Sequence, residues 1–127
     1  MPRPRRSLMA ALAVASALAL AGCGGEDEAP VRTQEGRLAL ALDDFLIAPQ
    51  NVTAGPGPIA IDAVNRGRVG HNLHVRRGED DDLIEVPTLL PGERGSATGT
   101  LRRGTYTLLC TVGNHRVLGM YGTLTVR

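Results

Sequence analysis

The sequence contains no lysine, no tryptophan, one phenylalanine and two tyrosines. With so few aromatic side chains, aliphatic residues must fill most of a core, so we expect Phe45 to be its large plug and a buried Tyr106 to need a hydrogen-bond partner. The 14 basic residues are all arginine and nearly balance the 13 acidic ones, which leaves a net charge of only +1. The chain therefore lacks the basic face typical of nucleic-acid binding. Its 127 residues leave room for a single domain.

No apolar run reaches the roughly 20 residues that a bilayer-spanning helix needs. The longest run, residues 8–20, follows three arginines and has the length of the hydrophobic region of a secretory signal peptide. It ends in Leu20–Cys23, the sequence LAGC, which resembles the lipobox of bacterial lipoproteins, where cleavage before the cysteine accompanies its lipidation. We therefore expect a lipoprotein signal peptide over residues 1–22 and lipid attachment at Cys23.

This interpretation places the chain outside the cytoplasm, lipid-anchored to a bacterial membrane, on the outer face of the cytoplasmic membrane or on the periplasmic side. An ordinary secreted protein is the alternative, and the pair Arg5–Arg6 leaves twin-arginine export open beside Sec export. Residues 23–36 are acidic, poor in apolar side chains and interrupted by glycine and proline, which predicts a flexible tether. The domain itself is predicted over residues 37–127.

The remaining sequence shows no helical pattern, because glycine and proline recur and the apolar residues alternate or form short runs. Strands are expected near residues 37–44, 58–65, 71–76, 83–87, 96–101, 105–110 and 121–127. Segments rich in glycine and proline separate them at intervals typical of an antiparallel sandwich or barrel. We predict an all-β fold, a Greek-key β-sandwich of about seven to eight strands.

The scarcity of cysteine makes Cys110 informative. If Cys23 carries lipid, Cys110 has no cysteine partner, and a free thiol in an oxidising compartment must be buried or bound to something. Four residues separate Cys110 from His115, and four more separate His115 from Met120. Two glycines give this segment the backbone freedom for a tight loop, in which the three side chains could converge on one metal ion.

A fourth ligand must come from elsewhere, and His71 follows a turn-forming segment at the start of another predicted strand. Two imidazoles, a thiolate and a thioether suit copper, because thiolate favours Cu(I), imidazole accepts either oxidation state and a weak axial thioether demands little geometric change. Alone, a cysteine or a histidine is more often structural. The joint pattern favours a metal site, although packing in the core would explain Met120 equally well.

The segments VNRGRVGHNLHV and GTYTLLCTVGNHRVLGMYGTLTV resemble the cupredoxins, the small blue copper proteins that include plastocyanins, azurins and sulfocyanin-like proteins. The resemblance runs in order over residues 37–127. It implies that His71, Cys110 and His115 form the trigonal plane of a type 1 copper site, and that Met120 is the axial ligand.

The resemblance also implies roles for residues beside the ligands. The carbonyl of Gly70 would lie near the opposite axial position, and Asn72 would tie its strand to the backbone at Thr111, just beyond Cys110. Such contacts hold ligands in place and tune a metal's potential. Arg116 stands beside the histidine edge that is exposed in the family, where it would favour an anionic partner.

We expect three other polar features to be structural. His74 lies three residues from His71 and so has the opposite strand parity. The acidic run over residues 79–82 lacks the spaced ligands of a calcium loop and is interpreted as a solvated turn. Arg76 and Arg77 are expected to be exposed charges.

These observations predict a monomeric one-electron carrier with one type 1 copper ion, which meets redox partner proteins of the membrane or periplasm. A copper carrier or delivery protein is the alternative, and a metal-free structural domain is a second one. An enzyme is not expected, because His74 is the only histidine left over for a second copper ion.

Overall fold

The alternating apolar segments form strands: a computed structural model describes residues 30–33 and 36–127 as ten strands without a helix. In this part of the chain, no helix is long and apolar enough to cross a bilayer. The predicted signal peptide, Cys23 and most of the predicted tether lie outside the described residues.

Seven of the strands fall where the sequence predicts them, and three short ones are additional. In chain order the strands are β1 (Val31–Arg32), β2 (Arg37–Asp43), β3 (Leu46–Ala48), β4 (Asn51–Ala54), β5 (Gly57–Asn65), β6 (His71–Arg77), β7 (Asp81–Leu89), β8 (Arg94–Leu101), β9 (Gly104–Leu109) and β10 (Tyr121–Val126).

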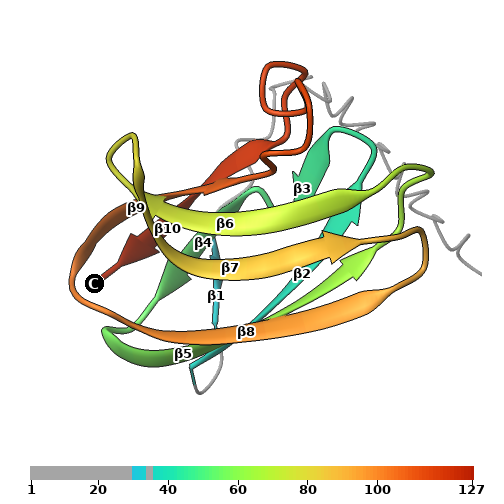
Figure 1. Ribbon diagram of the computed structural model, residues 1–127. Helices are drawn as coiled ribbons and strands as arrows, with labels where there is room; N and C mark the ends of the chain where they lie inside the picture. Colours follow the sequence, from blue (N-terminus) through green and yellow to red (C-terminus); the bar gives the residue numbers. More distant parts are fainter. Residues whose placement is uncertain (1–29, 34–35) are drawn as a thin grey trace, which may run out of the picture.

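The strands form two facing sheets (Figure 1). The larger sheet has the order β1-β4-β10-β9-β6-β7, and the smaller one has the order β3-β2-β5-β8. The predicted all-β sandwich is therefore confirmed. The expected antiparallel pairing holds for most neighbouring strands. It does not hold for all of them, because β2 pairs in parallel with β5 and β4 pairs in parallel with both β1 and β10.

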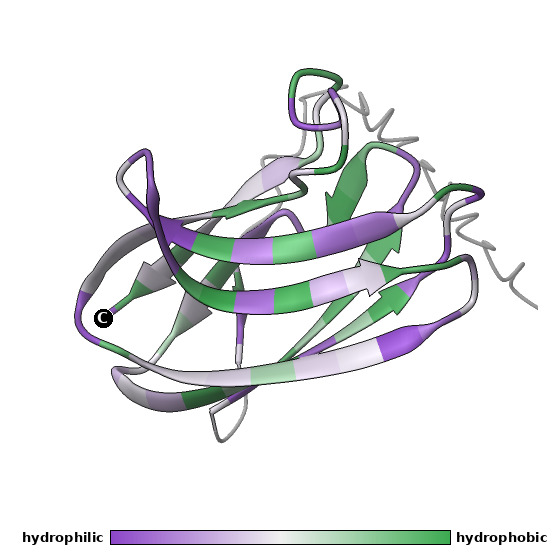
Figure 2. Ribbon diagram, in the orientation of Figure 1, coloured by the Kyte–Doolittle hydropathy of each residue, from purple (hydrophilic) through white to green (hydrophobic). Residues whose placement is uncertain are grey.

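The core lies between the two sheets and is almost entirely aliphatic, as the shortage of aromatic residues predicts. On β5, Ile59, Ile61 and Ala63 are buried and alternate with less buried residues. The parallel register sets Leu38 of β2 beside Ile61, so both strands turn the same side-chain face inward. Figure 2 shows the same alternation of hydrophobic and hydrophilic residues along β6 and β7.

One short strand lies within the segment predicted as a tether. Val31–Arg32 pairs in parallel with β4, and the backbone N–H of Thr33 donates to the carbonyl of Thr53 at 2.9 Å. The six-stranded sheet therefore includes residues that precede the predicted start of the domain at residue 37.

The turn between β2 and β3 differs most from expectation. Asp43 pairs with Leu46, so Asp44 and Phe45 form a two-residue hairpin loop. Phe45 has a φ of 65°, which is rare for a bulky residue, and its side chain is 37% exposed. The prediction that Phe45 plugs the core is wrong, because hydrogen bonding of the hairpin holds it in the turn.

Tyr106 of β9 behaves as the sequence predicts. The residue is only 5% exposed, and its hydroxyl donates to the carbonyl of Arg102 at 2.7 Å. The bond spans the turn between β8 and β9, so it fixes the entry to the strand that ends at Cys110.

Replacing Tyr106 by Phe should lower the free energy of unfolding of the metal-free protein by about 1 kcal/mol, because the part-buried hydrogen bond from the hydroxyl to the Arg102 carbonyl is lost. Urea unfolding of the Tyr106→Phe variant measures this. The control is Tyr121→Phe, since Tyr121 is 50% exposed and its hydroxyl can bond to water. Equal effects of the two changes would contradict a specific role for the Tyr106 hydroxyl.

Candidate metal centre

Three of the four predicted ligand residues lie at the ends of strands in the larger sheet. His71 is the first residue of β6, Cys110 directly follows β9, and Met120 directly precedes β10. His115 lies in the loop between the last two. Because β6 and β9 are antiparallel neighbours, the start of one lies beside the end of the other.

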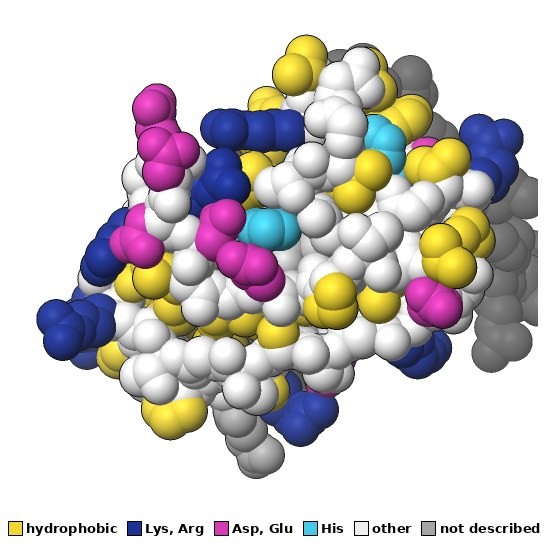
Figure 3. Space-filling view, in the orientation of Figure 1, with side chains coloured by type: hydrophobic (Ala, Val, Ile, Leu, Met, Phe, Trp, Pro, Cys, Tyr) yellow, Lys and Arg dark blue, Asp and Glu magenta, His cyan; other side chains and the backbone are white. Residues whose placement is uncertain are grey.

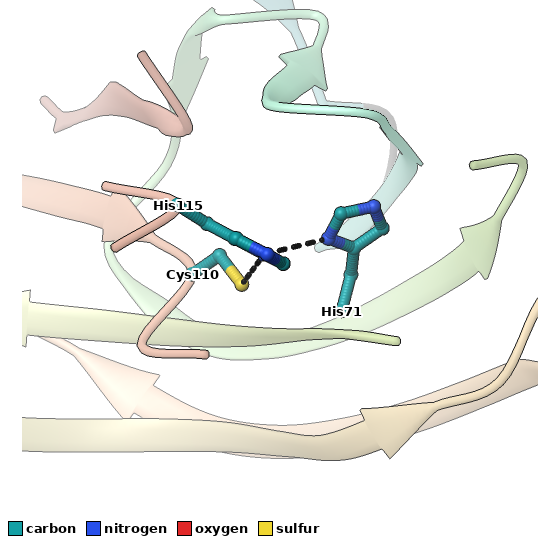
Figure 4. Close-up of side chains that lie close together, drawn as sticks. All are labelled: His71, Cys110 and His115. Atoms are coloured by element: carbon teal, nitrogen blue, oxygen red, sulfur yellow. Dashed lines mark hydrogen bonds between the residues drawn. The ribbon is translucent and has the colours of Figure 1, made fainter. Parts of the chain in front are cut away.

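Three of these residues bring metal-ligating atoms together (Figure 4). The two Nδ1 atoms of His71 and His115 are 3.2 Å apart, and the Sγ atom of Cys110 is 3.6 Å from Nδ1 of His115. All three ligating atoms lie within 4.8 Å of one another. His71 and Cys110 are fully buried, whereas His115 is partly exposed.

The loop that carries His115 is closed by backbone hydrogen bonds. The N–H of Cys110 donates to the carbonyl of Met120 at 3.1 Å, and the N–H of Met120 donates to the carbonyl of His115 at 3.0 Å. Gly113 and Gly119 have φ values of 49° and 113°, which glycine adopts readily. The loop thus has the tight turn that the spacing of its residues predicts, and it places Met120 in a fully buried position beside Cys110.

Asn72 joins the strand of His71 to the residue after Cys110. Its Oδ1 accepts the backbone N–H of Thr111 at 2.8 Å, and its Nδ2 donates to the Thr111 hydroxyl at 2.7 Å. On the other side of His71, a Cβ atom at Gly70 would lie 3.2 Å from Cγ2 of Thr88. The backbone at both neighbours of His71 is therefore closely confined.

Sequence reasoning missed the hairpin loop between β2 and β3 as part of the site. Oδ1 of Asp44 lies 3.3 Å from Nε2 of His71. The ring of Phe45 meets the ring of His115 edge to face at a centroid distance of 5.0 Å, and that of His71 at 6.5 Å. The sequence pattern predicts a strand over residues 37–44 and none over residues 46–48, so it does not indicate the hairpin.

Asp44 is also paired with Arg68. The Nε atom of Arg68 donates to Oδ2 of Asp44 at 2.9 Å, and its backbone N–H donates to Oδ1 at 2.8 Å. These bonds, chiefly the one from the guanidinium, lower the pKa of Asp44 from 3.8 to about 2. The carboxylate is therefore ionised at neutral pH.

His74 lies apart from the three converging residues. Its Nδ1 is 3.0 Å from Oδ2 of Asp82, and its Nε2 is 3.3 Å from the Thr111 hydroxyl. His74, Asp82 and Glu85 form a second group of potential ligands. Arg76, however, donates to both carboxylate oxygens of Asp82 at 2.6 and 2.9 Å. The Asp82 carboxylate is therefore already paired with a guanidinium, and we interpret this group as structural.

Two expectations about charged residues are corrected by this pair. The side chain of Arg76 is only 16% exposed, and that of Asp82 is 20% exposed. The acidic run therefore is not wholly a solvated turn, because its last two members belong to β7 and pair across to β6.

The donor set tests which metal the residues fit. One thiol sulfur and two imidazole nitrogens form a soft to borderline set that suits copper, whereas magnesium and calcium prefer oxygen ligands. The Nδ1 atoms of both imidazoles lie close to each other and to the Cys110 sulfur, so all three atoms could bind one ion. The residues present fit a copper ion.

The comparisons with known proteins agree with this chemistry. The family model described as copper binding proteins of the plastocyanin/azurin family matches residues 40–127. The match covers more than half of the chain, which therefore belongs to this family, the cupredoxins, and its cofactor is copper. No curated protein sequence matches the chain significantly.

Solved structures of auracyanins share the fold. A dithionite-reduced auracyanin from Roseiflexus castenholzii is 20% identical, with a TM-score of 0.69 over 75% of this chain and 99% of that one. Auracyanin B is 25% identical, with a TM-score of 0.67 over 80% of this chain and 92% of that one. Auracyanin A from Chloroflexus aurantiacus, described as a "blue" copper protein, is 21% identical, with a TM-score of 0.64 over 72% of this chain and 100% of that one.

The Arg76–Asp82 pair next to His74 generates a prediction about pH. The Arg76 guanidinium, with a smaller contribution from His74, lowers the pKa of Asp82 from 3.8 to about 2. A lowered folded-state pKa stabilises the fold above pH 3.8, and this stabilisation is lost as the pH falls through about 2. Asp82→Asn should therefore destabilise the metal-free protein by about 2 kcal/mol at neutral pH and by much less at pH 2.

Urea unfolding of wild type and variant at several pH values measures this difference. Asp80→Asn is the matched control, because Asp80 is an exposed acid of the same turn. A destabilisation by Asp82→Asn that is as large at pH 2 as at pH 7 would contradict an ion-pair origin.

Proposed function

We propose that this protein is a one-electron carrier with a type 1 copper centre held by His71, Cys110, His115 and Met120. The observation that carries the proposal is the convergence of one thiol and two imidazoles, all within 4.8 Å of one another. Copper supplies the redox chemistry by cycling between Cu(II) and Cu(I). The chain's own contribution is to hold its ligands in one arrangement that both states accept.

Burial of the ligands supports retention of the metal for redox use. His71, Cys110 and Met120 are each 0% exposed, and the hairpin residue Phe45 covers one edge of the His115 ring. A delivery protein must release its metal to an acceptor, which favours open and exchangeable ligands. The alternative of copper delivery therefore has no observation in its favour.

The exposed surface near His115 supports a docking face for redox partners. Figure 3 shows hydrophobic side chains gathered at the end of the sandwich that carries the loop between β9 and β10. Val117 is 86% exposed, Leu118 51% and Tyr121 50%. Weak electron-transfer complexes bury little surface, and a small apolar patch around a ligand edge suits such brief contacts. The neighbouring Arg116 adds a positive charge that favours an anionic partner.

We propose further that the carrier works outside the cytoplasm, anchored by lipid at Cys23. The support is the run of apolar residues that ends in the LAGC segment, and the acidic sequence that follows it. A tether at Cys23 would keep the domain close to redox partners in the membrane.

The test of the copper centre compares two cysteine variants. Adding Cu(II) to the wild type should give an intense blue or green band, because the thiolate donates charge to the metal. Cys110→Ser should abolish the band, whereas the matched control Cys23→Ser should retain it and lose only the lipid. Visible absorption spectra measure both results. A colourless wild type, or a band that survives in Cys110→Ser, would contradict the proposal.

The Met120→Leu variant tests the axial ligand. Its colour should persist, since the thiolate remains, but the reduction potential should rise because a thioether donor to Cu(II) is lost. Voltammetry of the two proteins measures the shift. A fall in potential would show that Met120 is not the axial ligand.

A further inference from the structure

The hairpin loop between β2 and β3 reaches the metal centre with both of its residues. Asp44 lies against His71, and the next residue, Phe45, lies against His115. Phe45 keeps a φ of 65°, a conformation that costs a bulky side chain free energy and often occurs at functional sites. The smaller sheet thus contributes to a site whose predicted ligands all belong to the larger one.

The two ring nitrogens of His71 face different partners. Nδ1 lies 3.2 Å from Nδ1 of His115, on the side of the site, and Nε2 lies 3.3 Å from Oδ1 of Asp44. A neutral imidazole carries its proton on one nitrogen only, and the other nitrogen keeps the lone pair that binds a metal. A proton on Nε2 that is donated to a carboxylate therefore leaves Nδ1 free to ligate.

The carboxylate is fixed from its other side. Arg68 donates to Asp44 from its backbone N–H and from its guanidinium, and the Asp44 side chain is only 22% exposed. Side chains that are held at both oxygens have little freedom to rotate away. Asp44 is thus anchored in the place where it meets His71.

Gly67 supplies an independent sign that this contact is built into the fold. A Cβ atom at Gly67 would overlap Oδ1 of Asp44 and would lie 2.7 Å from Nε2 of His71. Gly67 is not among the glycines with positive φ, so its backbone conformation does not call for glycine. Glycine is required here by the close approach of Asp44 and His71, because any larger side chain would occupy the space of their contact.

We propose that Asp44 is a positioning residue for the metal ligand His71. Its carboxylate accepts the Nε2–H of His71, which fixes the tautomer and the ring orientation and leaves Nδ1 for copper. The negative charge also makes the imidazole a stronger donor, and this stabilises Cu(II) relative to Cu(I). The inference rests on the proposed type 1 copper centre and adds to it the residue that orients a ligand and lowers the reduction potential.

Two substitutions separate the charge of Asp44 from its hydrogen bond. Asp44→Asn removes the charge and keeps an acceptor oxygen, so the reduction potential should shift upward and the affinity for Cu(II) should fall by a smaller factor than in Asp44→Ala. Asp44→Ala removes both, so the potential should also shift upward and the affinity for Cu(II) should fall by roughly 10- to 100-fold, the usual cost of losing such a partner. Voltammetry and titration with Cu(II) measure the two quantities on the full chain.

The matched control is Asp62→Asn on the smaller sheet. Asp62 also pairs with an arginine and accepts a second hydrogen bond, from Arg37 and Ser96, each at 2.6 Å. The variant therefore makes the same change in charge away from His71, and its potential should equal that of the wild type. Gly67→Ala provides a test without a change of charge, because the added methyl group should displace the Asp44–His71 contact and lower the affinity for Cu(II).

The outcomes distinguish this inference from the proposed function. A coloured wild type whose potential is unchanged in both Asp44 variants would overturn the role of Asp44 and leave the copper centre standing. An upward shift in Asp62→Asn as large as that in Asp44→Asn would also overturn it, because general loss of charge would then explain the result. A wild type without the thiolate-to-copper band would overturn both proposals.

Discussion

The antiparallel pairing of β6 with β9 is the constraint on which the metal centre depends. His74 pairs with Leu109, so the first residue of β6 lies beside the segment that follows β9. Asn72 extends this pairing through two hydrogen bonds to Thr111, one of them to its backbone N–H. His71 and Cys110 thus lie close together because β6 and β9 are in register. The loop between β9 and β10 then brings His115 and Met120 back to the same place.

Both sheets contribute residues to the metal centre. The larger sheet carries all four proposed ligands, and the smaller sheet supplies the hairpin loop that packs on the two histidines. Contacts from both sheets hold the donor atoms close together. Such preorganisation limits the rearrangement that accompanies a change of oxidation state, which is the property that an electron carrier needs.

Much of this arrangement could be predicted from the sequence, because it depends on local patterns. Alternation located seven strands, and the spacing of Cys110, His115 and Met120 indicated a chelating loop. The partners of each strand could not be predicted, since pairing joins residues far apart in the chain. For this reason the three parallel strand pairs were not expected. Phe45 was misplaced because hydrophobicity predicts burial, whereas the two-residue hairpin holds its ring on the ligands. Asp44 was missed because its partner His71 lies 27 residues away.

In the proposed copper centre, one thiolate and two imidazoles bind a single copper ion in an arrangement that persists in both oxidation states. X-ray absorption at the copper edge, recorded on the oxidised and the reduced protein, tests this most directly. Such a centre should show one short copper–sulfur distance and two copper–nitrogen distances in both states, with little change between them. Absence of the short sulfur distance, or a change in the number of ligands on reduction, would contradict it.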